Sequence, residues 1–499
     1  MTKILLVTSN FEENTGPLYA DREKVLDMID GSHYPLGITY LHSYVESCGH
    51  EVRSLFLNSF SQEMCFGEVA RVLEEFRPEI VGFQMLTQNR VSTYRLMEYI
   101  HGKYPEMRIV AGGVHASIMY EQLVKKYPYL VVVIGEGELT FGELIKTMNE
   151  GGDLEKVEGI AFNRGGQLVK TKMRPLIKNL DELPFPKHEL YFTRKRTHAN
   201  ILTSRGCPCR CSFCALDSIS LGVNRTRSVK NVIEEVEDLV RKYPRLKMVW
   251  IQDDTFFLNN ERVIEFCDEV VKRKIRLNFV CSGRIKPFSE KMARKLEEAN
   301  FSKIMFGLES GVDEILTKAH KGITQRTALE TFQILSKTNL DVMCFLIVGL
   351  PGETEKTILE TAEFVRKLQR MRYILYGDAA ILLVYPGTEV CRIAEEKGQL
   401  TDDIWLTDAI TPVYEVEHDV KELERYKKLL LDRIAFDRII TPKDFLKPQW
   451  FDALKAQWAM VPYGASYMAD LAWRRRRNIA SKIVSKISRR IPIPALRGK

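Results

Sequence analysis

The chain has 499 residues, of which 45% are hydrophobic and 28% charged, so its composition fits roughly two to four globular domains and excludes a disordered or fibrous protein. Ten Lys and Arg residues lie in 471–499, which has no Asp or Glu, so without this tail the formal net charge of +7 becomes −3. This distribution argues against a broad basic surface for nucleic acid and predicts a local basic patch.

We expect no secretory signal in "MTKILLVTSN", because its apolar run is shorter than the roughly 7–15 residues that such a signal needs. The longest apolar stretch, 342–350, is less than half of the roughly 20 residues that span a bilayer. We therefore expect a cytoplasmic protein. Its ten cysteines are then expected to bind metal, to act in catalysis or to lie in the core rather than to form disulfides. Core burial is expected for Cys267 and Cys344, which fall on an apolar helix face and an apolar strand.

Short β-like runs alternate with helical patterns in two blocks, which is typical of parallel α/β architecture. Residues 1–150 predict a doubly wound, Rossmann-like domain, with strands at 3–9, 50–57, 79–86, 108–113 and 130–138. Residues 151–195 predict a hairpin turned at 164–166, followed by a proline-rich linker.

The second block, residues 196–400, contains six further β/α units, from "ANILTSR" to "AAILLVYPG" at 379–387. Six units predict a partial (β/α)6 TIM-like barrel, whose chemistry lies at the carboxyl ends of its strands. Residues 401–499 are expected to be mainly helical and to end in a basic amphipathic tail.

Four cysteines follow the first barrel strand in "SRGCPCRCSFC", and Cys207, Cys211 and Cys214 have the spacing C-x3-C-x2-C. A zinc site or an electron-transfer cluster that uses all four thiols is one interpretation, because both metals favour thiolates. However, four ligands within eight residues leave the loop little freedom to wrap a metal, and the sequence has no second C-x2-C pair. A cluster held by three thiolates would leave one iron open to a bound substrate.

This segment, placed directly after the strand that opens a β/α barrel, resembles the radical S-adenosylmethionine (SAM) superfamily. The resemblance implies that Cys207, Cys211 and Cys214 hold a 4Fe-4S cluster, whose fourth iron binds the amino and carboxylate groups of SAM. Phe213 matches the aromatic residue that is usual before the last cysteine. Cys209 departs from the pattern, and we expect it not to be a ligand.

The same resemblance assigns SAM contacts to later strand ends. Asp253 and Asp254 would accept hydrogen bonds from the SAM ammonium group, although Asp254 also fits a helix N-cap. The remaining candidates would contact the ribose, carboxylate or adenine, and each also fits a structural role: Ser282, Arg284, Glu309 and Gly349.

The first block has no G-x-G-x-x-G turn after its first strand, so a nicotinamide cofactor is not expected. Its strand ends, "YPLGITYLHSYVESCGHEV", "EIVGFQMLT", "VAGGVHA" and "VIGEGE", resemble the cobalamin-binding domain that precedes the radical SAM barrel in one large branch of the superfamily. The candidate cobalamin contacts are Tyr34, Gly37, Gln84, Leu86, Thr87, Gly112, Gly113, Gly135, Glu136 and Gly137.

The D-x-H-x-x-G pattern that supplies an axial histidine in other cobalamin domains would fall at Ser32 to Gly37, where Tyr34 takes the histidine's place. Binding of the cobalt by this pattern is therefore not expected. His33 and His115 are alternative ligands, but a solvated or core histidine is the favoured interpretation of both.

The resemblance implies that the reduced cluster cleaves SAM, that the resulting radical removes a hydrogen atom from the substrate, and that methylcobalamin donates a methyl group. We therefore expect a methyltransferase that acts on an unactivated carbon of a small or hydrophobic molecule, with an external electron donor of flavodoxin or ferredoxin type and no nucleic acid partner. The alternatives are an enzyme that forms or rearranges a ring without methyl transfer, and a cobalamin sensor module. No catalytic acid or base is assigned.

The tail carries apolar residues at spacing four, Ile479, Ile483 and Ile487, with Lys and Arg residues around the rest of the expected helix. A helix of this kind lies in the interface of an anionic membrane, which predicts peripheral contact with the inner face of the membrane. The alternatives are a helix packed on the barrel and a basic tail that touches a protein partner.

Overall fold

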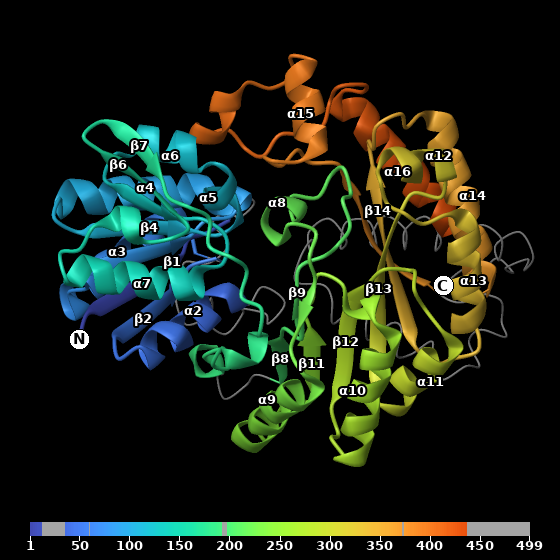
Figure 1. The fold of residues 1–499 in the computed structure, drawn as a ribbon. Coiled ribbons are helices and arrows are strands. Elements are labelled where there is room, and N and C mark those ends of the chain that lie inside the picture. The colour runs from blue at the N-terminus through green and yellow to red at the C-terminus, as the bar shows by residue number, and fades with distance from the viewer. Residues whose placement is uncertain (12–34, 59, 192–196, 372–373, 437–499) are drawn as a thin grey trace, which may run out of the picture. The chain divides into compact units, whose positions relative to one another are not determined.

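The computed structural model describes residues 1–11, 35–58, 60–191, 197–371 and 374–436. Residues 1–434 form one compact unit (Figure 1). The expectations for Tyr34, for His33 and for the basic tail lie outside the described residues.

The first sheet has the expected doubly wound form. Its parallel strands are β1 (Lys3–Thr8), β2 (Glu51–Phe56), β3 (Ile80–Gln84), β4 (Arg108–Gly112) and β5 (Leu130–Val133), in the order β2-β1-β3-β4-β5. The helices between and after them are α2 (Leu36–Ser47), α3 (Gln62–Phe76), α4 (Arg90–Lys103), α5 (Val114–Ile118), α6 (Tyr120–Lys126) and α7 (Gly137–Asn149). Residues 4–7 of β1 are fully buried, because both faces of the sheet are covered.

The hairpin at 164–166 is present and extends this sheet. Its strands β6 (Ile160–Arg164) and β7 (Gln167–Lys170) are antiparallel, and β6 pairs with β5. β5 ends at Val133, earlier than the expected 138, because Gly137 already begins α7.

The second sheet confirms the partial (β/α)6 barrel. All its strands are parallel and follow chain order: β8 (His198–Ile201), β11 (Met248–Ile251), β12 (Asn278–Gly283), β13 (Phe301–Glu309), β14 (Asp341–Val348) and β15 (Ile374–Ile381). β15 begins five residues before the expected position, because Gly377 and Asp378 interrupt the apolar run from which the strand was predicted.

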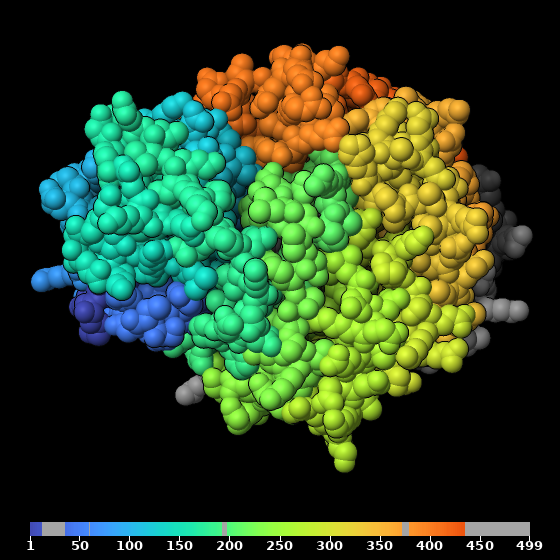
Figure 2. Space-filling view, in the orientation of Figure 1, coloured from blue at the N-terminus to red at the C-terminus, as the bar shows by residue number. Residues whose placement is uncertain are grey.

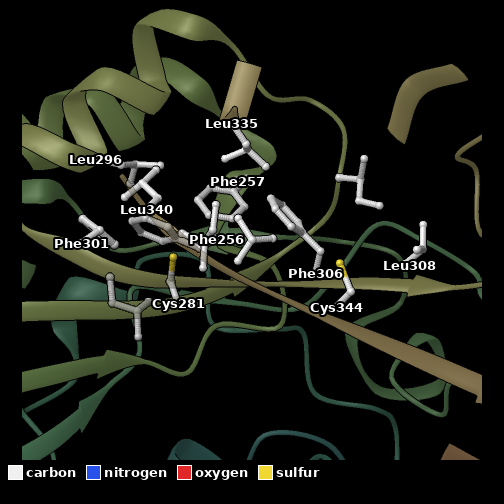
Figure 3. Packing of buried hydrophobic residues seen from close by; sticks show 14 of the residues in the cluster. Phe256, Phe257, Cys281, Leu296, Phe301, Phe306, Leu308, Leu335, Leu340 and Cys344 are labelled. Carbon is white, nitrogen blue, oxygen red and sulfur yellow. The ribbon is translucent and has the colours of Figure 1, made fainter. Parts of the chain in front are cut away.

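Helices cover one side of this sheet, where α10, α11, α13 and α14 lie in Figure 1. The helices that follow its strands are α9 (Val229–Lys242), α10 (Asn260–Lys272), α11 (Glu290–Glu298), α12 (Asp313–Lys318), α13 (Gln325–Leu335) and α14 (Glu355–Met371). Figure 3 shows the aromatic core between sheet and helices, with Phe257 and Phe306 near its centre. The thiols of Cys281 and Cys344 are fully buried in this core, as is Cys267, so the expectation for Cys267 and Cys344 is confirmed.

The chain after the barrel is helical in its described part, with α15 (Glu389–Glu396), a 3-10 turn at Asp402–Leu406 and α16 (Val420–Phe436). Trp405 is 1% exposed and belongs to the same buried cluster as residues of β1 and β3 in the first domain. Its carbonyl accepts a hydrogen bond from the hydroxyl of Tyr94 at 2.9 Å. This segment therefore ties the end of the barrel to the first domain. None of the described helices is long and apolar enough to cross a membrane.

Candidate active site

The cysteine loop lies between the two antiparallel strands of a short ribbon, β9 (Ser204–Arg205) and β10 (Arg225–Thr226), which sequence analysis did not predict. Gly206 has a φ of +86°, and a Cβ there would lie 2.2 Å from the carbonyl oxygen of Val223. Only glycine fits this position. The backbone N–H of Ser212 donates to the carbonyl of Ala319 at 3.1 Å, which fixes the far end of the loop to the segment after α12.

The four thiols of the loop are more accessible than the cysteines of the core, since Cys207, Cys209 and Cys211 are partly exposed and Cys214 is exposed. The thiol of Cys207 donates a hydrogen bond to Cys209, which lowers the pKa of Cys209 to about 6. The positive charges of Arg284 and Lys321 also lower this pKa, whereas burial raises it. Two cationic side chains therefore act on the loop from the barrel.

Both aspartates after β11 accept hydrogen bonds from the residues that lead into the cysteine loop. The carboxylate of Asp253 is buried and accepts four hydrogen bonds of 2.6–3.1 Å, from the backbone N–H and the hydroxyl of both Thr203 and Ser204. Asp254 accepts from the N–H of Gly206 at 2.9 Å. Burial raises the pKa of Asp253, although these hydrogen bonds oppose the shift. Asp253 thus supports the loop through contacts that sequence analysis missed.

Arg284 and Glu309 lie on neighbouring strand ends, and the structure adds Lys321 to them. The ammonium group of Lys321 lies 2.7 Å from Glu309 Oε1, and the side chains are only 10% and 8% exposed. Arg284 donates to the carbonyl oxygen of Lys321. Lys321 was missed because it lies outside the recognised motifs, in the segment "HKGIT" that has no periodic signal.

Gly349 lies in the turn after β14, and its backbone N–H donates to Glu353 Oε2 at 2.7 Å. The other carboxyl oxygen of Glu353 is buried without a hydrogen-bond partner. Burial raises the pKa of Glu353 to about 7. Ser282, the remaining candidate for SAM, is partly exposed on β12.

The described cobalamin candidates gather at the carboxyl edge of the first sheet. Gln84 ends β3 and Gly112 ends β4, and the two are register partners. Gly37 lies beside Gln84, whose amide nitrogen is 3.2 Å from the position that a Cβ at Gly37 would take. The other described candidates follow the ends of β3, β4 and β5: Leu86, Thr87, Gly113, Gly135, Glu136 and Gly137.

His115 is fully buried at this edge, and both its ring nitrogens have partners at 3.1 Å, the hydroxyls of Thr87 and Tyr94. Burial, aided by the charge of Arg90, lowers the pKa of His115 to about 3, so the ring is neutral. This geometry is that of a core histidine.

Glu136 joins this edge to the cysteine loop. Its carboxylate accepts both guanidinium N–H groups of Arg225, at 2.8 and 3.0 Å, and one from Arg205 at 3.1 Å. Burial disfavours the charged carboxylate, but Arg225 and Arg205 outweigh it and lower the pKa of Glu136. Arg205 also donates to Glu138 at 2.6 Å.

The residues present fit the groups that the sequence implies. The accessible loop offers four thiols, and the three at the predicted spacing are of the kind that can hold an iron–sulfur cluster. Among the described residues, no three His, Cys, Asp or Glu side chains converge where a single metal ion could bind, but a cluster needs no such convergence, because each thiolate binds a different iron. At the first sheet, the carboxyl edge offers backbone and amide groups to a large planar ligand.

Both domains of this chain match known protein families. Residues 201–365 match the radical SAM superfamily, and residues 23–145 match the B12 binding domain. An uncharacterised methyltransferase of Pyrococcus horikoshii is 31% identical over 396 residues, which are 78% of this chain and 84% of that protein.

An anaerobic magnesium-protoporphyrin IX monomethyl ester cyclase of Rubrivivax gelatinosus is 26% identical over 352 residues, 68% of this chain and 63% of the cyclase. Among solved structures, the radical SAM methyltransferase TsrM of Kitasatospora setae superposes with a TM-score of 0.64 at 21% identity, covering 80% of this chain and 77% of TsrM. At this identity, the superposition supports the fold.

Proposed function

We propose that this chain, which belongs to the cobalamin-binding radical SAM family, is a methyltransferase that acts on an unactivated carbon of a small or hydrophobic molecule. It is an enzyme whose cofactors are a 4Fe-4S cluster, SAM and cobalamin. When bound, these cofactors supply the electron, the radical chemistry and the methyl group. The observation that carries the proposal is the 31% identity to an uncharacterised methyltransferase over 396 residues, which are 78% of this chain.

We assign the cluster to Cys207, Cys211 and Cys214, and leave Cys209 without a ligand role.

Around the cluster, groups of both signs complement SAM, which carries an ammonium and a carboxylate group. Asp254 is exposed and accepts a hydrogen bond from one backbone N–H, so it is the better acceptor for the ammonium than Asp253, whose oxygens already receive four hydrogen bonds. Arg284, Ser282, Glu309 and Gly349 stay candidates for the remaining contacts.

For cobalamin, we propose that the strand-end groups from Gly37 to Gly137 hold the corrin, without a histidine bound to cobalt. The support is that His115 is buried, neutral and hydrogen-bonded on both ring nitrogens. Glu136 is committed to Arg205 and Arg225, so its proposed contact with cobalamin would run through its backbone.

The inner side of the second sheet supports a hydrophobic substrate. Strand alternation points Met343 and Phe345 away from the helix-covered core that contains Cys344. Met343 is buried in an apolar cluster with Val280 and Met305, whereas Phe345 is 40% exposed. An apolar surface of this kind favours a substrate with a large non-polar part.

An external electron donor of flavodoxin or ferredoxin type fits the exposed position of the cysteine loop. Cys214 is exposed, and the neighbouring Leu221 and Val223 are 64% and 44% exposed. Figure 2 shows the green segment around α8 (Asp217–Ser220) at the surface of the face drawn. A donor could therefore approach close to the cluster.

We further propose that the basic tail contacts an anionic membrane, which would suit a substrate taken from the bilayer. The support is the sequence pattern alone, in which Ile479, Ile483 and Ile487 form one face of an expected helix that is otherwise basic.

The test is anaerobic reconstitution with iron, sulfide and hydroxocobalamin, followed by incubation with methyl-labelled SAM and cell extract. A product that carries the label, absent when Cys211→Ala replaces the protein, is the expected result. Ring formation without methyl transfer is the second candidate, favoured by the relation to the cyclase of Rubrivivax gelatinosus. An unlabelled new product that depends on SAM cleavage would support that candidate and contradict methyl transfer.

A further inference from the structure

The cysteine loop lies against a buried ion pair, Lys321 and Glu309, in which Lys321 belongs neither to the family motifs nor to the proposed SAM contacts. Lys321 follows α12, and the backbone of this segment is bonded to the loop through Ser212 N–H and the carbonyl of Ala319, 3.1 Å apart. The Lys321 ammonium group is 5.8 Å from the centre of the Phe213 ring, directly before Cys214. The ammonium group thus lies at the inner side of the loop.

The surrounding structure is shaped to hold this cation. A Cβ at Gly307 would lie 2.2 Å from Glu309 Oε1 and 2.7 Å from Lys321 Nζ, so a larger residue at position 307 would displace the paired groups. Glu309 itself has a φ of +62°, an unusual backbone for a residue with a side chain. Strain of this kind persists only where other contacts enforce it.

The local charge is net positive on the barrel side of the loop. Arg284 and Lys321 supply two cations, and Glu309 compensates one of them. On the other side of the loop, Asp254 accepts a hydrogen bond from the N–H of Gly206, directly before Cys207.

We propose that Lys321, held by Glu309, tunes the reduction potential of the iron–sulfur cluster. A cluster bound by three thiolates is anionic, and reduction adds a further negative charge. A fixed cation in a site of low dielectric stabilises the reduced form more than the oxidised form, and so raises the potential. Lys321 is thus a positioning residue for electron transfer, and this role rests on the cluster assigned under the proposed function.

The test is the midpoint potential of the cluster in the reconstituted full chain, measured by redox titration with electron paramagnetic resonance and without SAM. Omitting SAM separates this role from any contact of Lys321 with the SAM carboxylate. Lys321→Met should lower the midpoint potential at full iron content, and Lys321→Arg should keep it near the wild-type value. Lys318→Met, which removes a lysine that is 46% exposed and pairs with Glu314, should leave it unchanged.

Glu309→Gln should change the midpoint potential in the opposite direction. It removes the compensating negative charge and leaves the cation, so the midpoint potential should rise. If Lys321→Met does not retain iron, this second variant decides the question. Unchanged potentials in iron-loaded Lys321→Met or in Glu309→Gln would overturn the proposal. Loss of iron in every variant and in the wild type would instead contradict the cluster assignment.

Discussion

Arg205, two residues before the first cysteine of the loop, donates to the carboxylate of Glu138 at 2.6 Å, although the two residues are 67 positions apart. Glu138 belongs to the first turn of α7 and is the last residue of the "GEGE" segment, at which cobalamin is expected to bind. The side chains are 16% and 6% exposed, so the pair is withdrawn from water. The loop assigned to the cluster is therefore bonded directly to the edge assigned to cobalamin.

Replacing Arg205 should destabilise the protein more than replacing any exposed arginine of the loop. Arg205→Gln leaves Glu138 buried without its charged partner, and breaking a buried pair in this way costs about 3–5 kcal/mol. Arg210→Gln is the matched control, because Arg210 is 78% exposed and lies 3.7 Å from Asp217. Thermal unfolding should show a clear drop in Tm for the first variant and nearly none for the second. Equal Tm values would mean that the pair contributes no stability.

Loss of one thiol should separate ligands from the bystander. Cys207→Ala, Cys211→Ala and Cys214→Ala should each abolish iron binding and the brown absorption of the reconstituted protein, because each removes one of three thiolates. Cys209→Ala should keep both, and it serves as the control within the same loop. Iron analysis and the visible spectrum measure the outcome. A Cys209→Ala protein as poor in iron as the others would show that the three-ligand assignment is wrong.

Glu353 should make stability depend on pH. Its pKa is about 7 in the folded protein against 4.5 for the ordinary group, so between these values the folded state binds more protons than the unfolded state. The contribution is fully present below about pH 4.5 and is lost as the pH rises through about 7, by at most on the order of 3 kcal/mol.

Glu353→Gln keeps an oxygen to accept from Gly349 and removes the titration. We expect it to match the wild type in Tm at pH 5 and to exceed it at pH 8. Glu355→Gln, with a side chain that is 49% exposed, controls for the loss of a nearby carboxylate. A wild-type excess at pH 8 would contradict the buried neutral carboxyl.

The contacts of Asp253 and Lys321 mark the limit of what the sequence could predict. The cysteine spacing is local, and the strands are short apolar runs, so the fold class and the three cysteines follow from patterns within a few residues. The partners of Asp253 are Thr203 and Ser204, which come from a strand end about 50 positions earlier, and no local pattern couples them. The role of Lys321 could not be predicted for the same reason, because it depends on contacts with both Glu309 at the end of β13 and the cysteine loop.

The full chain should retain hydroxocobalamin through gel filtration, with a base-off spectrum. The reason is that the described sheet edge offers backbone and amide groups, while His115 is hydrogen-bonded on both ring nitrogens. His33→Ala should leave the spectrum unchanged. Failure to retain any corrinoid in protein that holds its full complement of iron would contradict the assignment, and a base-on or histidine-bound spectrum lost in His33→Ala would reassign the axial ligand.

The tail should bind anionic vesicles. Residues 471–499 carry ten basic and no acidic side chains, and each basic residue near an anionic surface adds about 1 kcal/mol of attraction. Trp473 precedes the expected helix and would sit at the interface, where tryptophan is favoured. Co-sedimentation should therefore recover the full chain with anionic vesicles at low salt and much less with neutral ones.

A chain ended at Asp470 should stay in the supernatant with both. Equal sedimentation of the two chains, or none of the full chain at low salt, would rule the tail out as a membrane contact and favour a helix packed on the barrel or bound to a protein partner.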